Sequence, residues 1–177
     1  MVKQNALRLV RLLKGDITRQ TGVDAIVMTV PQNLRLEGEL NAAVVKAAGT
    51  SLSRQVLKTI TKPRAGESYL LPGFDLPASR VIAIIMPPVV AGVGPEDKNL
   101  LNAWRGPLDL AWKKQLRRIA FPALCTGPGG FAPQRAARLA FQVIEENSGE
   151  DLDEIRIVCN REDTYRAFVE RLEKLTT

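Results

Sequence analysis

The sequence predicts a three-layer α/β/α domain built on a mixed, largely parallel central sheet. Short apolar runs alternate with amphipathic stretches along the 177 residues, a pattern typical of strands that alternate with helices. The runs at 25–30 and 81–86 are nearly continuous, as in strands buried on both faces. No internal repeat or low-complexity linker divides the chain, so we expect one domain over residues 1–177.

Each strand and helix is predicted from the local pattern of apolar residues and from the residues that begin or end it. Apolar runs predict strands at Leu7–Leu13, Asp24–Val30, Glu67–Leu71, Arg80–Met86, Arg117–Leu124 and Ile155–Cys159. Pro31 should end the second strand, because proline cannot donate to a central ladder. Helices are predicted at Gly38–Ala48, at 50–60 with Thr50 or Ser51 as its cap, at Lys98–Gln115, from Pro133 to Asn147, and at Glu162–Leu175. A loop is predicted over 89–97.

Composition excludes several kinds of chemistry. The chain has no histidine, which removes Ser-His-Asp and Cys-His catalysis and the HExxH zinc site. Its two cysteines form no CxxC motif, so we expect neither a redox motif nor a metal site and no cofactor. The apolar runs are too short to cross a membrane and no export signal precedes them, so we expect a cytoplasmic protein without a membrane partner.

The net charge of +6 permits a polyanionic partner such as nucleic acid. Lys113, Lys114, Arg117 and Arg118 form a local basic stretch, which either complements a helix dipole or forms part of a nucleic-acid patch. The aromatic residues are not interleaved with these charges, so the sequence predicts no stacking platform there.

Two loops after predicted strands can carry ligand chemistry. Cys125–Phe131 holds three glycines and one proline before a helix, which predicts either an anion cradle of backbone amides or a tight turn. It is neither a P-loop nor GxGxxG. Asp16 follows the first strand and can cap a turn through the Thr18 amide or accept a hydrogen bond from the amine of a base. The polar loop from Pro31 to Asn41 predicts no pair of carboxylates at catalytic spacing.

Several segments, taken in order, resemble the macrodomain family, an ADP-ribose-binding α/β/α module. Gly15-Asp16-Ile17-Thr18 resembles the family's opening G-D-I-T, and Val23–Val27 resembles its D-A-I-V strand. The helix that ends in Ala47-Ala48-Gly49 is similar to one ending in A-A-G. Ile119–Gly127 with Gly130-Phe131 resembles I-A-F-P-A-(I/L)-x-T-G-x-x-G. The resemblance runs from about Leu7 to Leu172.

The resemblance implies a set of ligand-binding residues. Asp16 corresponds to the aspartate that accepts from the adenine amino group, and Ile17 to its neighbour along the base. The loop corresponding to Thr126, Gly127, Pro128, Gly129, Gly130 and Phe131 holds the diphosphate through backbone amides and places an aromatic by the distal ribose. Asn160 and Tyr165 lie near the family's position for an aromatic against adenine. Gly38 is the one glycine kept from a glycine run, and Asn41 stands where many hydrolases have aspartate.

The departures from the family concern hydrolysis. Met28–Pro31 replaces N-A-A-N, whose asparagine lies by the distal ribose, and Asn33 substitutes for it only if the loop shifts. Glu37 and Glu39 enter the former glycine run, and Ala83 replaces a histidine. We therefore expect binding of ADP-ribose, of a related adenine nucleotide or of an ADP-ribosylated target, without efficient hydrolysis.

Two alternatives stay open. The first is an ADP-ribosyl or phosphate ester hydrolase that uses Asn33, Asn41 or a glutamate, Glu37 or Glu39, as the reacting groups. The second is a nucleic-acid or protein-binding module that has lost the pocket.

The resemblance also makes neighbours of the strands that end near Cys125 and Cys159. The two thiols would then be close, and the helix N-terminus beside Cys125 would favour a thiolate. The alternative is two small buried residues without chemistry.

Overall fold

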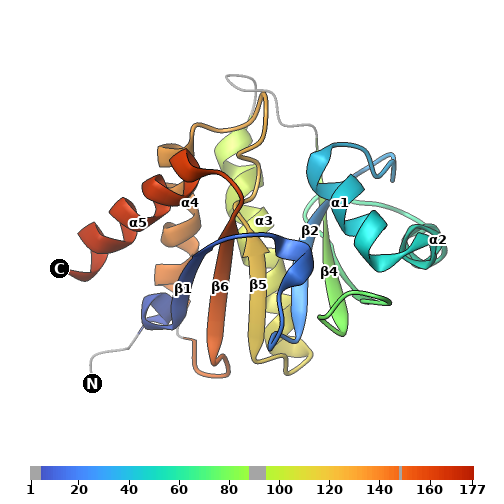
Figure 1. Cartoon of the computed structure of the whole chain (residues 1–177), viewed down its shortest axis with the longest axis horizontal. Coiled ribbons are helices and arrows are strands. Elements are labelled where there is room, and N and C mark those ends of the chain that lie inside the picture. Colours follow the sequence, from blue (N-terminus) through green and yellow to red (C-terminus); the bar gives the residue numbers. More distant parts are fainter. Residues whose placement is uncertain (1–4, 88–94, 148) are drawn as a thin grey trace.

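Six strands form one sheet in the order β1-β6-β5-β2-β4-β3, with helices on both faces (Figure 1). The structure is a computed structural model, and the residues described are 5–87, 95–147 and 149–177. The strands are β1 Val10–Lys14, β2 Ala25–Pro31, β3 Ser68–Pro72, β4 Arg80–Met86, β5 Arg118–Pro122 and β6 Glu154–Cys159. The helices are α1 Glu39–Ala48, α2 Thr50–Thr59, α3 Glu96–Lys113, α4 Pro133–Glu146 and α5 Glu162–Thr176, with 3₁₀ turns η1 Ala6–Leu9 and η2 Ile17–Arg19.

The sheet is mixed and largely parallel. β1, β6, β5, β2 and β4 pair in parallel, and only the edge strand β3 runs antiparallel to its neighbour β4. Parallel neighbours need crossover connections, and helices supply most of them here. The predicted fold class is confirmed.

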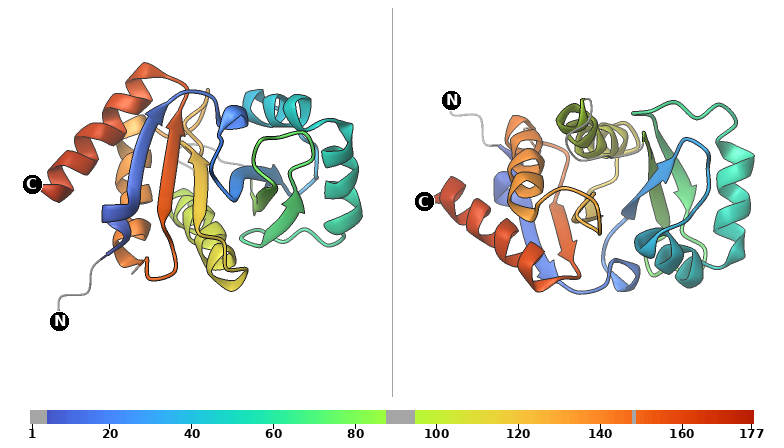
Figure 2. Two further views of the ribbon diagram at one scale, coloured as in Figure 1. Left: turned by 60° about the horizontal axis from the view of Figure 1, so that its bottom comes forward. Right: turned by 90° about the horizontal axis from the view of Figure 1, so that it is seen from above.

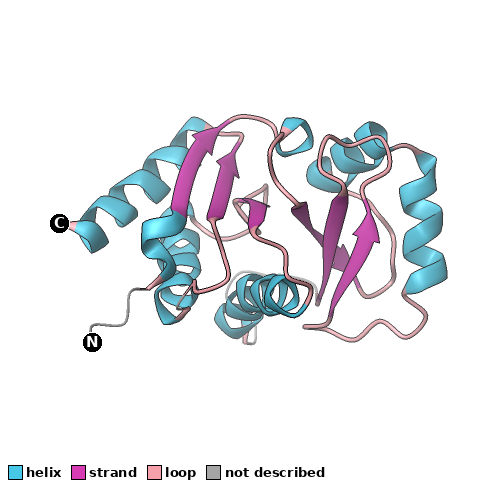
Figure 3. Ribbon diagram, turned by 90° about the horizontal axis from the view of Figure 1, so that it is seen from below, coloured by secondary structure: helices cyan, strands magenta, loops and turns pink. Residues whose placement is uncertain are grey.

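Alternate strand residues divide the core into two parts. In β4, Ile82 and Ile84 pack with α3, α4 and α5 in one hydrophobic cluster, whereas Val81, Ala83 and Ile85 pack with α1 and α2 in the other. This period of two is that of a strand buried on both faces. Figures 2 and 3, which view the molecule from other sides, show the resulting helical layers on either side of the sheet.

The chain changes from one face of the sheet to the other beside β2. The helices that follow β4, β5 and β6 pack on one face, whereas α1, which follows β2, packs on the opposite face. β2 pairs with β5 through only two residues, Ala25 with Ile119 and Ile26 with Ala120, so their carboxyl ends are not paired. Ligands of open α/β sheets bind at such a switch point, beyond the carboxyl ends of the strands.

Several predicted boundaries were wrong, each for a local reason. Residues 7–9 form the 3₁₀ turn η1 instead of strand, because the Asn5 side chain accepts from the Leu7 amide. Pro31 belongs to β2, where it pairs in register with Met86. Helix α2 has Gly49 as its N-cap and no side-chain cap from Thr50 or Ser51. Most of the loop predicted over 89–97 falls outside the described residues, and α3 starts at Glu96.

Candidate functional site

The predicted site residues follow four adjacent strands at the carboxyl edge of the sheet. Register pairs Lys14 with Cys159 and Pro122 with Val158, so β1, β6 and β5 end side by side. The Gly15 amide also donates to the carbonyl oxygen of Cys159 at 2.9 Å. The sheet therefore brings the loops after β1, β2, β5 and β6 to one edge, as their positions in the sequence predicted.

The loop after β5 is folded by its own backbone. The Gly130 amide donates to the Gly127 carbonyl at 2.9 Å, and the Phe131 amide donates to the Cys125 carbonyl at 2.8 Å. A Cβ at Gly130 would lie 2.2 Å from the Cys125 oxygen, so only glycine fits there. The loop is thus a tight turn, as one interpretation predicted.

The same loop leaves backbone donors unused. Within the described part of the chain, no backbone or side-chain acceptor takes the amides of Gly127 and Gly129. A Cβ placed at either glycine would meet nothing within 4 Å, so a ligand can approach both closely. Pro133 starts α4 directly after the loop, as predicted, and a helix N-terminus favours an anion. Both interpretations of the loop are therefore compatible: it is a tight turn with two open donors.

Of the two interpretations of the cysteines, the structure supports neutral thiols and not a thiolate at Cys125. Burial raises the pKa of Cys125 to about 12, and it does the same for Cys159. The Cys125 thiol donates a weak hydrogen bond to the Met86 Sδ at 3.7 Å, which favours the protonated thiol. β5 and β6 are neighbours as expected, but both cysteines are free thiols without the environment of a reactive one.

Phe131 is 6% exposed and packs in the core between the loop and α4. The Arg135 guanidinium lies 5.2 Å from the centre of its ring, and Arg135 also pairs with Glu96 at the start of α3. The side chain therefore anchors the loop. Its place by a distal ribose stays a prediction.

Asp16 caps the turn η2, which is one of the two roles that the sequence predicted for it. Its Oδ1 accepts from the Thr18 amide at 2.9 Å and from the Thr18 hydroxyl at 2.7 Å, and these bonds hold the pKa of Asp16 below its usual value. The Oδ2 lies 3.8 Å from Arg19 Nε. About half of the side chain is exposed, so one carboxylate oxygen can still accept from a base amine. Ile17 beside it is buried.

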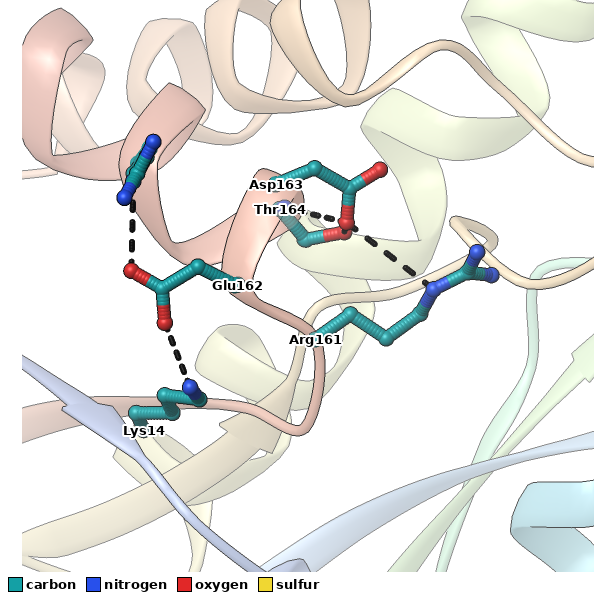
Figure 4. A network of polar contacts seen from close by, with 6 residues as sticks. Lys14, Arg161, Glu162, Asp163 and Thr164 are labelled. Carbon is teal, nitrogen blue, oxygen red and sulfur yellow. Dashed lines mark hydrogen bonds and ion pairs between the residues drawn. The ribbon is translucent and has the colours of Figure 1, made fainter.

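Asn160 lies exposed in the turn between β6 and α5. The charged residues that follow it form a network of polar contacts with Lys14 (Figure 4). Lys14 at the end of β1 donates to Glu162, which also accepts from Arg166 at 3.2 Å. Arg161 lies 3.9 Å from Asp163. Tyr165, one turn into α5, packs against the core instead of standing free at the edge.

The loop between β2 and α1 holds Asn33, Gly38 and Asn41. The Asn33 side chain is exposed and accepts from the Arg35 amide at 2.9 Å, so it stabilises its own loop. Gly38 has φ +91 with nothing near its Cβ position, which gives the chain room to turn into α1. Both Glu37 and Glu39 are exposed to solvent, where their charges are screened.

Asn41 stands out because it is polar, buried and unsatisfied. It is 6% exposed in the first turn of α1, and its Oδ1 has no hydrogen-bond partner among the described residues. A buried acceptor without a partner costs about 1–3 kcal/mol, so such an atom is usually completed by a ligand or water. The sequence offered no sign of this state, because burial of a polar residue does not follow from its pattern.

The described residues include no group of three or more Cys, Asp or Glu side chains arranged to hold a metal ion. None of the helices over the described ranges is both long and apolar enough to cross a bilayer.

Comparison with known proteins decides the family. The model of the Macro domain family matches residues 27–140. The chain belongs to the macrodomain family. A macro domain-containing protein of Methanosarcina mazei is 32% identical over 94% of this chain and 89% of its own length. Another, from Ralstonia nicotianae, is 36% identical over 84% of this chain and 85% of its own.

Solved macrodomains share the fold. A mutant of the Oceanobacillus iheyensis macrodomain matches with TM-score 0.86 and 28% identity, covering 94% of this chain and 92% of that one. Another mutant of the same macrodomain, solved with ADPR, matches with TM-score 0.85 and 26% identity over the same shares. The Trypanosoma brucei macrodomain in complex with ADP-ribose matches with TM-score 0.81 and 30% identity, covering 93% of this chain and 69% of that one.

Proposed function

We propose that this macrodomain binds ADP-ribose, free or on a modified target, at the carboxyl edge of its sheet. We propose also that it hydrolyses the bond between ADP-ribose and the target only inefficiently. The observation that carries the proposal is the pair of open amides at Gly127 and Gly129, in front of the N-terminus of α4. Amides of this kind, with a helix dipole behind them, suit a diphosphate.

Two further side chains fit the rest of the ligand. Asp16 keeps an exposed carboxylate oxygen that can accept from the adenine amine. The unpartnered Oδ1 of Asn41 can accept from a ribose hydroxyl at the start of α1. Solved relatives that carry ADP-ribose or ADPR at TM-scores of 0.81 and 0.85 support the same ligand class.

Inefficient hydrolysis follows from what the edge offers as a base. The chain has no histidine, and Asn41 is an amide that cannot take a proton from water near neutral pH. Glu37 and Glu39 are exposed to solvent, so neither carboxylate is held in a dry pocket beside a bound substrate. Hydrolysis through Glu37 or Glu39 is the second candidate, favoured only by their place in the loop after β2.

Gly127→Val tests the binding site. Its backbone has ordinary φ and its Cβ position is open, so the branched side chain should leave the fold intact and block the approach to the loop. Calorimetric titration should show that the wild type binds ADP-ribose more tightly than AMP and that the variant loses at least tenfold in affinity. Ala65→Val, which adds bulk at an exposed position before β3, is the matched control.

Equal affinity of wild type and Gly127→Val for ADP-ribose would remove this loop from the site. A separate assay follows release of ADP-ribose from a mono-ADP-ribosylated protein. Rapid turnover that falls in Glu37→Gln or Glu39→Gln would overturn the proposal of inefficient hydrolysis and support the second candidate.

A further inference from the structure

A tryptophan is exposed near the amino-terminal ends of the strands, at the edge of the sheet opposite the candidate site. Trp112, in the last turn of α3, is 64% exposed, although large apolar side chains are usually buried. It lines a hollow of about 710 Å³ together with Lys113, Gln115, Arg117 and Asp151. The turns before β5 and β6, which supply Arg117 and Asp151, lie at the bottom of Figure 1.

The ring of Trp112 is held in place. Its Nε1 donates to Asp151 Oδ2 at 2.9 Å, across from the turn before β6. The neighbouring Arg117 donates through Nε and Nη2 to both oxygens of Asp153, at 3.0 Å each. Side chains fixed by hydrogen bonds lose less conformational entropy when a ligand binds, so this surface is pre-organised.

The charges around the ring are of two kinds. Asp153 is neutralised by Arg117, and Asp151 is bonded to the indole. Lys113, Lys114 and Arg118 are exposed, and none of them forms an ion pair with a carboxylate within the described ranges. An exposed aromatic ring with unpaired cations close to it in the chain is an arrangement that can bind stacked bases and phosphates.

We infer that this surface binds single-stranded nucleic acid, with a base stacked on Trp112 and the neighbouring phosphates at Lys113, Lys114 and Arg118. The sequence predicted no stacking platform here, but Trp112 directly precedes Lys113 and its side chain is exposed to solvent. The cations extend from the end of α3 to the start of β5, which suits a strand better than a single nucleotide. Asp151 and Gln115 can bond the edge of the stacked base.

The test measures anisotropy of a fluorescein-labelled single strand of oligodeoxyadenylate, with the duplex of equal length and AMP as comparisons. The single strand should bind most tightly, because a duplex keeps its bases paired. Trp112→Ala should weaken binding by about five- to hundredfold, the range of one base–aromatic stack. Trp112→Phe, which keeps a ring, should retain most of the affinity and shows whether loss in the alanine variant reflects stacking.

Intrinsic fluorescence gives an independent readout. The chain has two tryptophans, and Trp104 is fully buried against Phe121. Quenching by the single strand should therefore come from Trp112 and disappear in Trp112→Phe. Unchanged fluorescence of the wild type at saturating single strand would exclude stacking on this ring and overturn the inference.

Charge is tested with matched pairs. The double variant Lys113→Gln/Lys114→Gln should make the negative slope of log association constant against log salt concentration shallower by about 1.4. Each neutralised single-strand phosphate contributes about 0.7 to this slope. Arg54→Gln/Lys58→Gln removes the same charge from exposed positions on α2 and should leave the slope nearly unchanged. Loss of binding only in the α2 pair would place the strand on the other layer.

Competition separates this inference from the proposed function. Saturating ADP-ribose should not displace the strand, because the two surfaces lie at opposite edges of the sheet. Displacement by ADP-ribose would mean that the nucleic acid occupies the carboxyl edge. Unchanged affinity for the nucleic acid in Trp112→Ala would also overturn the inference. The absence of single-strand binding at low salt would overturn this inference and leave the ADP-ribose proposal standing.

Discussion

Asn41 combines burial with an unsatisfied oxygen, and this cost is expected to be repaid on ligand binding. Asn41→Leu, of similar shape, removes the unpaired acceptor and should raise the free energy of unfolding by about 1 kcal/mol. For a chain of this size, that corresponds to a rise in melting temperature of about 2–4 °C. The same variant should bind ADP-ribose more weakly. Urea unfolding and calorimetry measure the two effects.

Asn147 provides the matched control for this substitution. Its Oδ1 accepts from the Gly149 amide at 2.8 Å, so Asn147→Leu leaves a donor without a partner and should destabilise the protein. It lies at the end of α4, away from the carboxyl edge, and should not change ADP-ribose affinity. If Asn41→Leu destabilises as much as Asn147→Leu, then the Asn41 amide has a structural role and the trade between stability and binding is refuted.

At the scale of elements, one carboxylate joins the start of β2 to the start of β5. Asp24 Oδ2 accepts from the amides of Arg117 at 2.7 Å and Arg118 at 2.9 Å, while its own amide donates to the Arg118 carbonyl at 2.8 Å. These bonds hold the two strands together where their short pairing begins. The junction matters for function because the unpaired ends of the same strands carry the candidate site.

Asp24→Ala should therefore lower the free energy of unfolding by about 1–3 kcal/mol, since two amides lose an anionic acceptor. Asp24→Asn keeps one oxygen and should cost less. Urea unfolding measures both, with Asp75→Ala, which changes an exposed aspartate in the turn between β3 and β4, as a comparison. Equal stability of Asp24→Ala and the wild type would show that water replaces the carboxylate at this junction.

The elements also show which features the sequence could predict. β4 was predicted with the bounds it has, Arg80–Met86, because a continuous apolar run between Ser79 and Pro87 leaves little choice. Pro133 marked the start of α4 for a similarly local reason. The turn η1 was missed because a single bond from Asn5 to the Leu7 amide overrides an apolar pattern.

The sequence predicted which loops form the candidate site. It did not predict which of their atoms are free to bind a ligand. Glycine spacing indicated the loop after β5, but which amides stay open depends on the bonds of Gly130 and Phe131 across the turn. The sequence left the state of Cys125 open between a thiolate favoured by the nearby helix and a neutral thiol, and burial favours the neutral thiol. Exposure of Trp112 likewise depends on how α3 ends, which no local pattern specifies.

At the scale of the whole molecule, the charge is unevenly distributed along the chain. Residues 1–94 contain 12 basic and 6 acidic side chains, whereas residues 95–177 contain 13 of each. The surplus of +6 thus belongs to the part that includes α1 and α2, not to the part that includes Trp112. Stacking and local cations, rather than net charge, must therefore direct a single strand to Trp112, which is why the α2 pair is the decisive control.

The pH dependence of stability also belongs to the whole molecule, because the chain has no histidine. Hydrogen bonds from Thr18, Arg117 and Lys14 hold the pKa values of Asp16, Asp153 and Glu162 below their usual values. Carboxylates with lowered pKa stabilise the fold above their unfolded pKa, near 4, and lose that contribution as the pH falls. Acid should therefore destabilise the protein only below about pH 4.

At alkaline pH the dependence of stability on pH has the opposite sign, because stability falls as the pH rises. Burial raises the pKa of Cys125 and Cys159 to about 12, so their neutral thiols stabilise the fold fully below the unfolded pKa of about 8.5 and progressively less above it. Between about pH 5.5 and 8, where histidine normally titrates, the melting temperature should stay constant. Thermal unfolding across about pH 3 to 10 measures the whole profile. Cys125→Ala/Cys159→Ala should flatten the alkaline limb and leave the acid limb unchanged, whereas a step near pH 6.5 in the wild type would contradict the assignment of titrating groups.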